Sequence, residues 1–343
     1  MADLAVKKPR VYLWDNVKAL LIVLVVVGHF VTQYTAQSEL MRSMFVIIYY
    51  FHMPLFVFVS GLFAKSSWKN GVLRVNKIIG YLILYVALKL IIFLEGLAFG
   101  KNVSFRLFYE AGIPWYMLAM AVFICTTYAL KDIKPQVLIP ITFVLALIAG
   151  YDSGINDVFA LSRIIVFYPI FLLGFYTDSN VLANFTRKKS LRIASAILLI
   201  AFIVAAFMAP GFFAQLGKAV TARHPYASFP VPSLGPIYRA LAYIAGAILS
   251  FAVICVLPNK QIKISYIGAA TLPIYFLHRP ILYVIMDSGL GDLIVKSIGG
   301  ELGMTVFLVL AVVLAFVLSA KPLSVPFNKI MKCKYGGVIN YEG

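Results

Sequence analysis

Cysteine and acidic residues are scarce in this chain. Its three cysteines, Cys125, Cys255 and Cys333, are far apart and form no metal-type pair. Neither a disulfide framework nor a zinc site is therefore expected, and we interpret the cysteines as small core residues. The sequence also lacks a glycine-rich phosphate loop, a nucleophile elbow and a paired-histidine zinc motif. These absences argue against the common nucleotide-binding, hydrolase and metalloenzyme classes, and we expect no metal cofactor.

Charge of either sign is sparse, whereas apolar residues abound. Charged residues make up 13% of the 343 residues, hydrophobic residues make up 62%, and the mean hydropathy is +0.94. A soluble domain is nearer half apolar and a quarter charged. The net charge of +17 would suggest nucleic acid in a soluble protein, but the basic residues fall at the ends of apolar segments. We therefore predict an all-α, polytopic membrane protein whose partner is the bilayer and not nucleic acid.

Ten apolar segments approach the length of about 20 residues that a helix needs to cross a bilayer. They are 13–35, 42–64, 78–98, 114–130, 137–150, 162–177, 193–209, 236–257, 266–287 and 303–320. The fifth and sixth are short, and their assignment is the weakest part of the count. We expect one transmembrane domain over residues 1–343, with basic cytoplasmic tails at 1–12 and 321–343 and no additional soluble domain.

The loop charges support this count and give an orientation. With both termini in the cytoplasm, nineteen of the thirty Lys and Arg residues lie in the tails or cytoplasmic loops, and six lie in outer loops. Such a bias is typical of cytoplasmic loops. The long loop at 210–235 is then outside. Its prolines, glycines and aromatic residues suggest an ordered loop that covers another feature, although an irregular loop is equally compatible.

The first apolar segment carries a row of titratable groups. Asp15 and Lys18 lie near its start, and His29 lies deep inside it. Lys18 and His29 are eleven residues apart, which on a helix is about three turns and roughly 16 Å, so the two side chains share one face. Imidazole titrates near neutrality and can accept a proton from a hydroxyl nucleophile. A histidine in a span can also simply hydrogen-bond a neighbouring helix.

Two motifs in and just after the second span are candidates for ligand contact. The segment 51–61 contains His52 and the pair Ser60-Gly61, which permits close approach of a backbone. Helix packing is the more frequent role of such a pair, and His52 could be a structural hydrogen-bonding residue. Arg74 and Lys77 begin the next helix, where they either anchor the loop or clamp the phosphates of a cytosolic ligand.

Three further motifs place polar groups in or beside spans. Trp115 and Tyr116 open the fourth span, where an aromatic belt is a sufficient explanation. Arg163 opens the sixth span and either extends outward or lines a cavity. The segment 272–280, L-P-I-Y-F-L-H-R-P, contains Tyr275 and His278 and breaks the ninth span. Such polar groups are costly at membrane depth unless they line a polar cavity, so we favour a functional role.

In this order, the motifs resemble the acyltransferase-3 family of integral-membrane acyltransferases. The resemblance covers about residues 10–320 and includes Lys18-x10-His29 preceded by Asp15, the basic pair Arg74 and Lys77, and the motifs F-H-M-P-L-F-V-F-V-S-G, P-W-Y-M-L-A, R-I-I-V-F-Y-P-I-F-L-L-G-F and L-P-I-Y-F-L-H. It is most similar to the branch of fucose O-acetylase-like proteins. Many relatives carry an extracytoplasmic esterase-like domain, which we do not expect here.

The resemblance implies ten core helices and transfer of an acyl group, usually acetyl, from cytosolic acetyl-CoA to a hydroxyl of a cell-surface carbohydrate. It also implies a multi-pass protein of the bacterial cytoplasmic membrane. His29 matches the family's catalytic base. The expected donor site comprises Asp15, Lys18, Arg74, Lys77 and Arg163, and the expected acceptor site or cavity comprises His52, Ser60, Trp115, Tyr116, Tyr275 and His278. The family usually has arginine where this chain has Lys18 and Lys77; lysine keeps the charge but loses the bidentate fork.

Other functions remain compatible with the same residues. In a proton-coupled transporter or flippase, Asp15, Lys18, His29 and His278 would form a relay. A scaffold protein is disfavoured because ionisable groups inside spans are costly. For the acyltransferase, both direct transfer and transfer through a covalent intermediate remain open, as does the side from which the acceptor enters.

Overall fold

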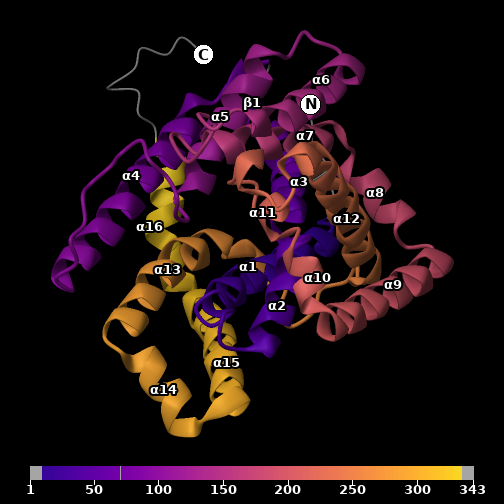
Figure 1. The fold of residues 1–343 in the computed structure, drawn as a ribbon. Coiled ribbons are helices and arrows are strands. Elements are labelled where there is room, and N and C mark those ends of the chain that lie inside the picture. Colours follow the sequence, from indigo (N-terminus) through magenta and orange to yellow (C-terminus); the bar gives the residue numbers. More distant parts are fainter. Residues whose placement is uncertain (1–9, 70, 334–343) are drawn as a thin grey trace.

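The structure, a computed structural model, describes residues 10–69 and 71–333 and is predominantly helical (Figure 1). Lys7, Lys8 and Lys334, which the sequence analysis placed in cytoplasmic tails, lie outside the described residues. A two-stranded antiparallel sheet of β1 (Trp68–Lys69) and β2 (Val72–Leu73) closes the turn before α4. The expected all-α class is therefore confirmed apart from this small hairpin.

A helix occupies each of the ten segments expected to be spans, although some segments are divided. Residues 42–64 contain α2 and α3, which meet at Tyr50 and Phe51. The helices are α1 (Tyr12–Val31), α2 (Glu39–Tyr49), α3 (His52–Ala64), α4 (Val75–Ala98), α5 (Trp115–Ala129), α6 (Pro135–Ile148), α7 (Leu161–Tyr176), α8 (Ser179–Phe185), α9 (Lys189–Met208), α10 (Pro210–Ala214), α11 (Gly217–Val220), α12 (Gly235–Val256), α13 (Thr271–Asp287), α14 (Leu290–Ile298), α15 (Gly300–Leu318) and α16 (Lys321–Lys332).

Length and composition identify fewer complete membrane crossings than ten. Within the described residues, six helical segments are long and apolar enough to cross a membrane: 12–31, 39–67, 75–98, 189–208, 232–256 and 300–318. The bent pair α7 and α8, which turns by 86°, could supply a seventh. Helices α5 and α6 are apolar but short. The chain is thus an all-α protein with several membrane-spanning helices, and the count of ten stays a prediction.

Helix α1 lies at the centre of the bundle, with α4 and α9 near opposite edges (Figure 1). It packs against α2, α3, α13, α15 and the short turn η5 (Ile267–Ala269). Asp15, Asn16 and most of the apolar residues of α1 are buried. In α9, by contrast, only Ser195 and Ala206 are buried, because its apolar surface faces outward, as expected of a lipid-facing helix.

Glycines allow two close backbone contacts around this centre. A Cβ on Gly61 of α3 would lie 2.1 Å from the carbonyl oxygen of Phe171 in α7, and one on Gly174 of α7 would lie 2.0 Å from that of Phe58. A Cβ on Gly268 of η5 would lie 2.0 Å from the carbonyl oxygen of Asp15. The packing role considered for Gly61 is therefore observed, and η5 lies directly against the start of α1.

The interpretation of all three cysteines as core residues was wrong. Cys255 is buried, but Cys125 and Cys333 are exposed. Cys125 belongs to the apolar helix α5, whose outward face is as apolar as its inward face. In a membrane protein the lipid-facing surface is also apolar, so hydrophobicity does not separate core from surface.

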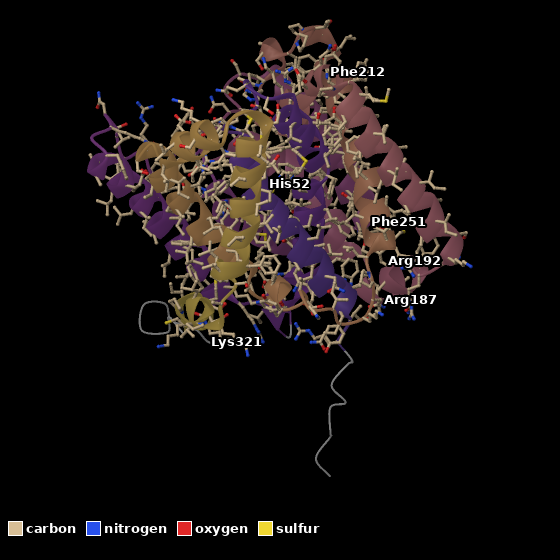
Figure 2. All side chains as sticks on the ribbon, turned by 90° about the horizontal axis from the view of Figure 1, so that it is seen from below. His52, Arg187, Arg192, Phe212, Phe251 and Lys321 are labelled. Atoms are coloured by element: carbon tan, nitrogen blue, oxygen red, sulfur yellow. The ribbon has the colours of Figure 1, made fainter. Side chains whose placement is uncertain are left out.

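The long loop at 210–235 is ordered by short helices and specific hydrogen bonds. It contains α10, α11 and the turns η3 (Tyr226–Ser228) and η4 (Pro232–Leu234). Ser162 donates to the carbonyl oxygen of Ala222 at 2.8 Å, and the hydroxyl of Tyr226 donates to that of Leu147 at 2.6 Å. Figure 2 shows Phe212 of this loop at one end of the bundle, whereas Arg187, Arg192 and Lys321 lie at the opposite end.

Candidate functional site

Two cavities lie along the face of α1 that carries Lys18 and His29. The first, of about 280 Å³, is lined by Lys18, Ser60, Lys77, Tyr116 and Tyr275 together with apolar residues, and we call it the Lys18 chamber. The second, of about 300 Å³, we call the His29 chamber. Its polar and aromatic lining residues include His29, Tyr49, His52, Trp115, Arg163, Arg223, Tyr275 and Arg279. Since Tyr275 lines both, the two chambers adjoin at this side chain.

Lys18 is held in its chamber by Asp15. Lys18 Nζ lies 3.0 Å from Asp15 Oδ1, and Arg10 Nε donates to Asp15 Oδ2 at 2.6 Å. The ammonium also lies 5.5 Å from the ring centroid of Phe63. Asp15 is buried and does not line the chamber, so it positions Lys18 and does not itself face the cavity.

The other expected donor-site residues are distributed differently. Lys77 lines the Lys18 chamber and donates to Ser66 Oγ at 2.8 Å. Arg74 lies just before α4, is exposed and does not line the chamber. Arg163 lies in the His29 chamber, away from the two lysines. The structure therefore brings Lys18 and Lys77 together and separates Arg163 from them.

A cluster of hydroxyl-bearing side chains lines the Lys18 chamber, and one of them, Tyr275, also lines the His29 chamber. Ser60 Oγ and Tyr116 OH are hydrogen-bonded, and Ser60 also donates to the carbonyl oxygen of Phe56 at 2.8 Å. The rings of Tyr116 and Tyr275 are 5.5 Å apart, and Tyr275 OH donates to the carbonyl oxygen of Ile113. These contacts hold the two rings in place, and Tyr275 lines both chambers.

Three histidines gather at the His29 chamber. Arg279 Nη1 lies 3.4 Å from His29 Nδ1, and because a guanidinium only donates, Nδ1 is the acceptor in this contact. His278 stacks on His29 with 5.2 Å between ring centroids. Its Nδ1 donates to the carbonyl oxygen of Ile274, as that of His52 does to Ile48, both at 2.9 Å. His52 lines the chamber, whereas His278 is fully buried behind His29.

Two arginines of the same chamber share one carboxylate. Arg163 Nη2 lies 3.3 Å from Asp157 Oδ1, and Arg223 Nη2 lies 2.6 Å from Asp157 Oδ2. Arg163 also donates to the carbonyl oxygens of Glu110 and Gly112. Burial raises the pKa of Glu110, and its Oε2 lies 3.0 Å from Lys89 Nζ, which opposes that rise. In the loop, burial and the neighbouring Arg223 lower the pKa of His224.

The structure also decides between the alternatives considered for the aromatic pair. Trp115 and Tyr116 are buried, so they do not form an aromatic belt at the lipid interface. The ring of Trp115 lies 4.9 Å from the guanidinium carbon of Arg163, and this stacking directs the arginine inward.

The sequence analysis did not select Arg223 or Arg279 as site residues. Arg223 was counted only among the charges of the outer loop, and no local pattern distinguishes it. Arg279 had a usable signal, because a basic residue inside a span is costly and here lies between His278 and Pro280. Tyr49 and Thr32 also line the chamber; Tyr49 ends α2, and Thr32 directly follows α1, three residues after His29.

No group of three or more His, Cys, Asp or Glu residues is arranged to hold a metal ion in residues 10–69 and 71–333.

Comparison with known proteins identifies the family. Residues 11–320 match a family model described as the acyltransferase domain of the acyltransferase-3 type. No match was found among curated proteins, and none among solved structures. The match covers the His29 chamber and all lining residues of the Lys18 chamber except Met331, and it does not distinguish the fucose O-acetylase-like branch, which stays a prediction. The chain, with its central α1 and the Lys18 and His29 chambers beside it, belongs to the acyltransferase-3 family.

Proposed function

We propose that this membrane acyltransferase moves an acetyl group from acetyl-CoA to a hydroxyl of a cell-surface or exported carbohydrate, with His29 as general base. The observation that carries the proposal is the adjacency of two chambers of different chemistry. One contains two lysines suited to a polyanionic donor, and the other contains the histidine suited to a hydroxyl acceptor.

The Lys18 chamber is the proposed donor site. Coenzyme A carries several phosphate charges, and lysine ammonium groups bind phosphates by charge-assisted hydrogen bonds. Lys18 and Lys77 line the chamber, and exposed Arg74 lies three residues before Lys77. The thioester arm would then run along α1 for the roughly 16 Å that separate Lys18 from His29 on a helix.

His29 is the proposed base for direct transfer. A nitrogen of His29 would take the proton from the acceptor hydroxyl while the hydroxyl oxygen attacks the carbonyl carbon of the thioester. The carbon–sulfur bond then breaks, and the thiolate takes the proton to leave as coenzyme A. His278 stacks on His29 and restrains its ring, and we assign it a positioning role. His52, Trp115, Arg163 and Tyr275 form walls of the acceptor side.

A proton relay from Asp15 through Lys18 to His29 and His278 is less well supported. Asp15 is already neutralised by Arg10 and Lys18. Moreover, the phenols of Tyr116 and Tyr275 in the Lys18 chamber are hydrogen-bonded to Ser60 and Ile113 and not to Lys18 or His29. The pair of chambers therefore favours group transfer over a relay.

The decisive experiment follows transfer of labelled acetyl from acetyl-CoA to carbohydrate acceptors by the purified protein. His29→Ala should abolish transfer while acetyl-CoA binding is largely retained. His224→Ala is the matched control, because His224 lies in the long loop at 210–235 and lines neither chamber. Wild-type turnover by His29→Ala, or a wild-type protein that neither transfers acetyl nor binds acetyl-CoA, would contradict the proposal.

A further inference from the structure

Arg279 is a cation in the His29 chamber without a carboxylate partner. Its Nη1 lies 3.4 Å from His29 Nδ1, and its guanidinium carbon lies 4.4 Å from the ring centroid of Tyr283. Within the described residues, its Nε is buried and has no hydrogen-bond partner, and no carboxylate lies within 4.0 Å of it. A charged group inside a membrane protein is costly unless an opposite charge meets it, so a ligand is the natural source of that charge.

The surrounding wall has the same sign. Arg163, Arg223 and Arg279 line the chamber, and none of its described lining residues is Asp or Glu. Asp157 lies behind the wall and binds both Arg163 and Arg223, so one carboxylate serves two guanidinium groups. A cavity lined by one sign of charge concentrates ions of the opposite sign. The chamber is therefore built to receive an anion and not a neutral sugar alone.

We propose that the acceptor is an anionic carbohydrate and that Arg279 binds the carboxylate or phosphate group next to the hydroxyl that receives the acyl group. The inference rests on the proposed acyl transfer and specifies its substrate class. A guanidinium presents two parallel N–H donors that match the two oxygens of a carboxylate or a phosphate.

The contact between Arg279 and His29 links recognition to chemistry. While Arg279 donates to Nδ1, a neutral His29 carries its proton on Nε2, and the Nδ1 lone pair is occupied. When the acceptor's anion draws Arg279 away, Nδ1 becomes free inside the chamber. The hydroxyl proton then passes to Nδ1 as the carbon–oxygen bond forms and the carbon–sulfur bond breaks. Binding of an anionic acceptor thus frees His29 Nδ1 to accept a proton, whereas water, which carries no charge, leaves Arg279 on Nδ1.

The test uses the full-length protein in lipid nanodiscs with labelled acetyl-CoA and three acceptors of one backbone. These are a uronic acid oligosaccharide, its carboxyl-reduced neutral form and the neutral form bearing a phosphodiester. One charged acceptor should show kcat/KM about 10- to 100-fold above the neutral form, and which one does so identifies the anion. Arg279→Gln should remove this preference, because KM for the charged acceptor rises and kcat for the neutral acceptor rises once Nδ1 is free, and Arg279→Lys should keep part of it. Arg187→Gln is the matched control, because Arg187 lines neither chamber and lies at the end of the bundle opposite Phe212 (Figure 2).

Equal kcat/KM for charged and neutral acceptors in the wild-type protein would overturn the inference while leaving acyl transfer intact. So would an equal loss of kcat on all acceptors in Arg279→Gln, which would assign the arginine to the thioester oxyanion. No transfer and no thioester hydrolysis with any acceptor would overturn the proposed function itself. The wild-type comparison decides the matter even if Arg279→Gln does not fold.

Discussion

The ring of Tyr275 lies 5.5 Å from the ring of Tyr116, between the Lys18 chamber and the His29 chamber. Both side chains are anchored by hydrogen bonds, Tyr116 to Ser60 and Tyr275 to the backbone of Ile113. In the proposed reaction, the thioester has to pass these rings to reach His29. The pair therefore separates donor from acceptor until the thioester arm displaces a ring.

Replacing the ring of Tyr275 by a smaller side chain should increase hydrolysis of acetyl-CoA relative to acetyl transfer. In Tyr275→Leu, we expect the ratio of acetyl-CoA hydrolysis to acetyl transfer to rise about tenfold, because a closed site normally excludes water from the reacting group. Tyr275→Phe keeps the ring and should keep the ratio within about twofold of wild type. Parallel assays of free coenzyme A and of acetylated product measure the ratio of hydrolysis to transfer. Tyr266→Leu, at an exposed position that lines neither chamber, is the control, and equal ratios in all variants would refute a barrier role.

The two lysines of the donor chamber should control donor affinity. Lys18→Gln and Lys77→Gln should each raise the KM for acetyl-CoA about tenfold with a smaller effect on kcat, because each removes a cation from the proposed phosphate site. Lys18→Arg should lower KM, since the arginine fork can bind a phosphate in a bidentate manner. Lys296→Gln is the control, because Lys296 is exposed and lines neither chamber. Unchanged KM in both glutamine variants would place the donor elsewhere.

The contact between α3 and α7 should tolerate no side chain at Gly61. Gly61→Ala would place Cβ 2.1 Å from the Phe171 carbonyl oxygen, and the backbone would have to move. Overpacking of this kind costs about 1–3 kcal/mol, which thermal unfolding of the purified protein can measure. Gly211→Ala is the matched control, because nothing lies within 4 Å of its added Cβ. Equal melting temperatures for the two variants would show that the helices are less closely packed than described.

The orientation of the chain can be tested at two labelled positions of Figure 2. In a cysteine-free background, Phe212→Cys should react with an impermeant maleimide added outside intact cells, whereas Arg187→Cys should react only after permeabilisation. The expectation follows from the excess of basic residues in the loops assigned to the cytoplasm. The reverse labelling pattern would show that the protein has the opposite orientation in the membrane. Donor and acceptor would then enter from the opposite sides.

Much of the architecture could be predicted from the sequence, because its signals are periodic or local. Hydrophobic length placed a helix at each of the ten expected segments, and the spacing of Lys18 and His29 placed both on one face of α1. The Ser60-Gly61 pair predicted close packing, which Gly61 provides against α7. Number and direction of crossings stay predictions, because α5, α6 and α7 are shorter than a typical crossing.

The features that were missed depend on contacts between distant segments. Arg223 reaches the His29 chamber from the long loop because Asp157, in the loop before α7, binds it. Arg163 was assigned to the donor, yet its neighbours Glu110, Gly112 and Asp157 hold it at the other chamber. Nor could hydrophobicity reveal that Cys125 faces outward, because the interior and the lipid-facing surface are similarly apolar.

One uninterrupted helix carries both Lys18 and His29, and Gly268 of the turn η5 packs against the backbone near its first turn. Helix α1 therefore fixes the distance between the proposed donor and acceptor sites. A substitution between the two residues leaves that distance unchanged. The insertion or deletion of a single residue, however, turns His29 by about 100° around the axis and moves it by about 1.5 Å. We conclude that this stretch can vary in composition but not in length.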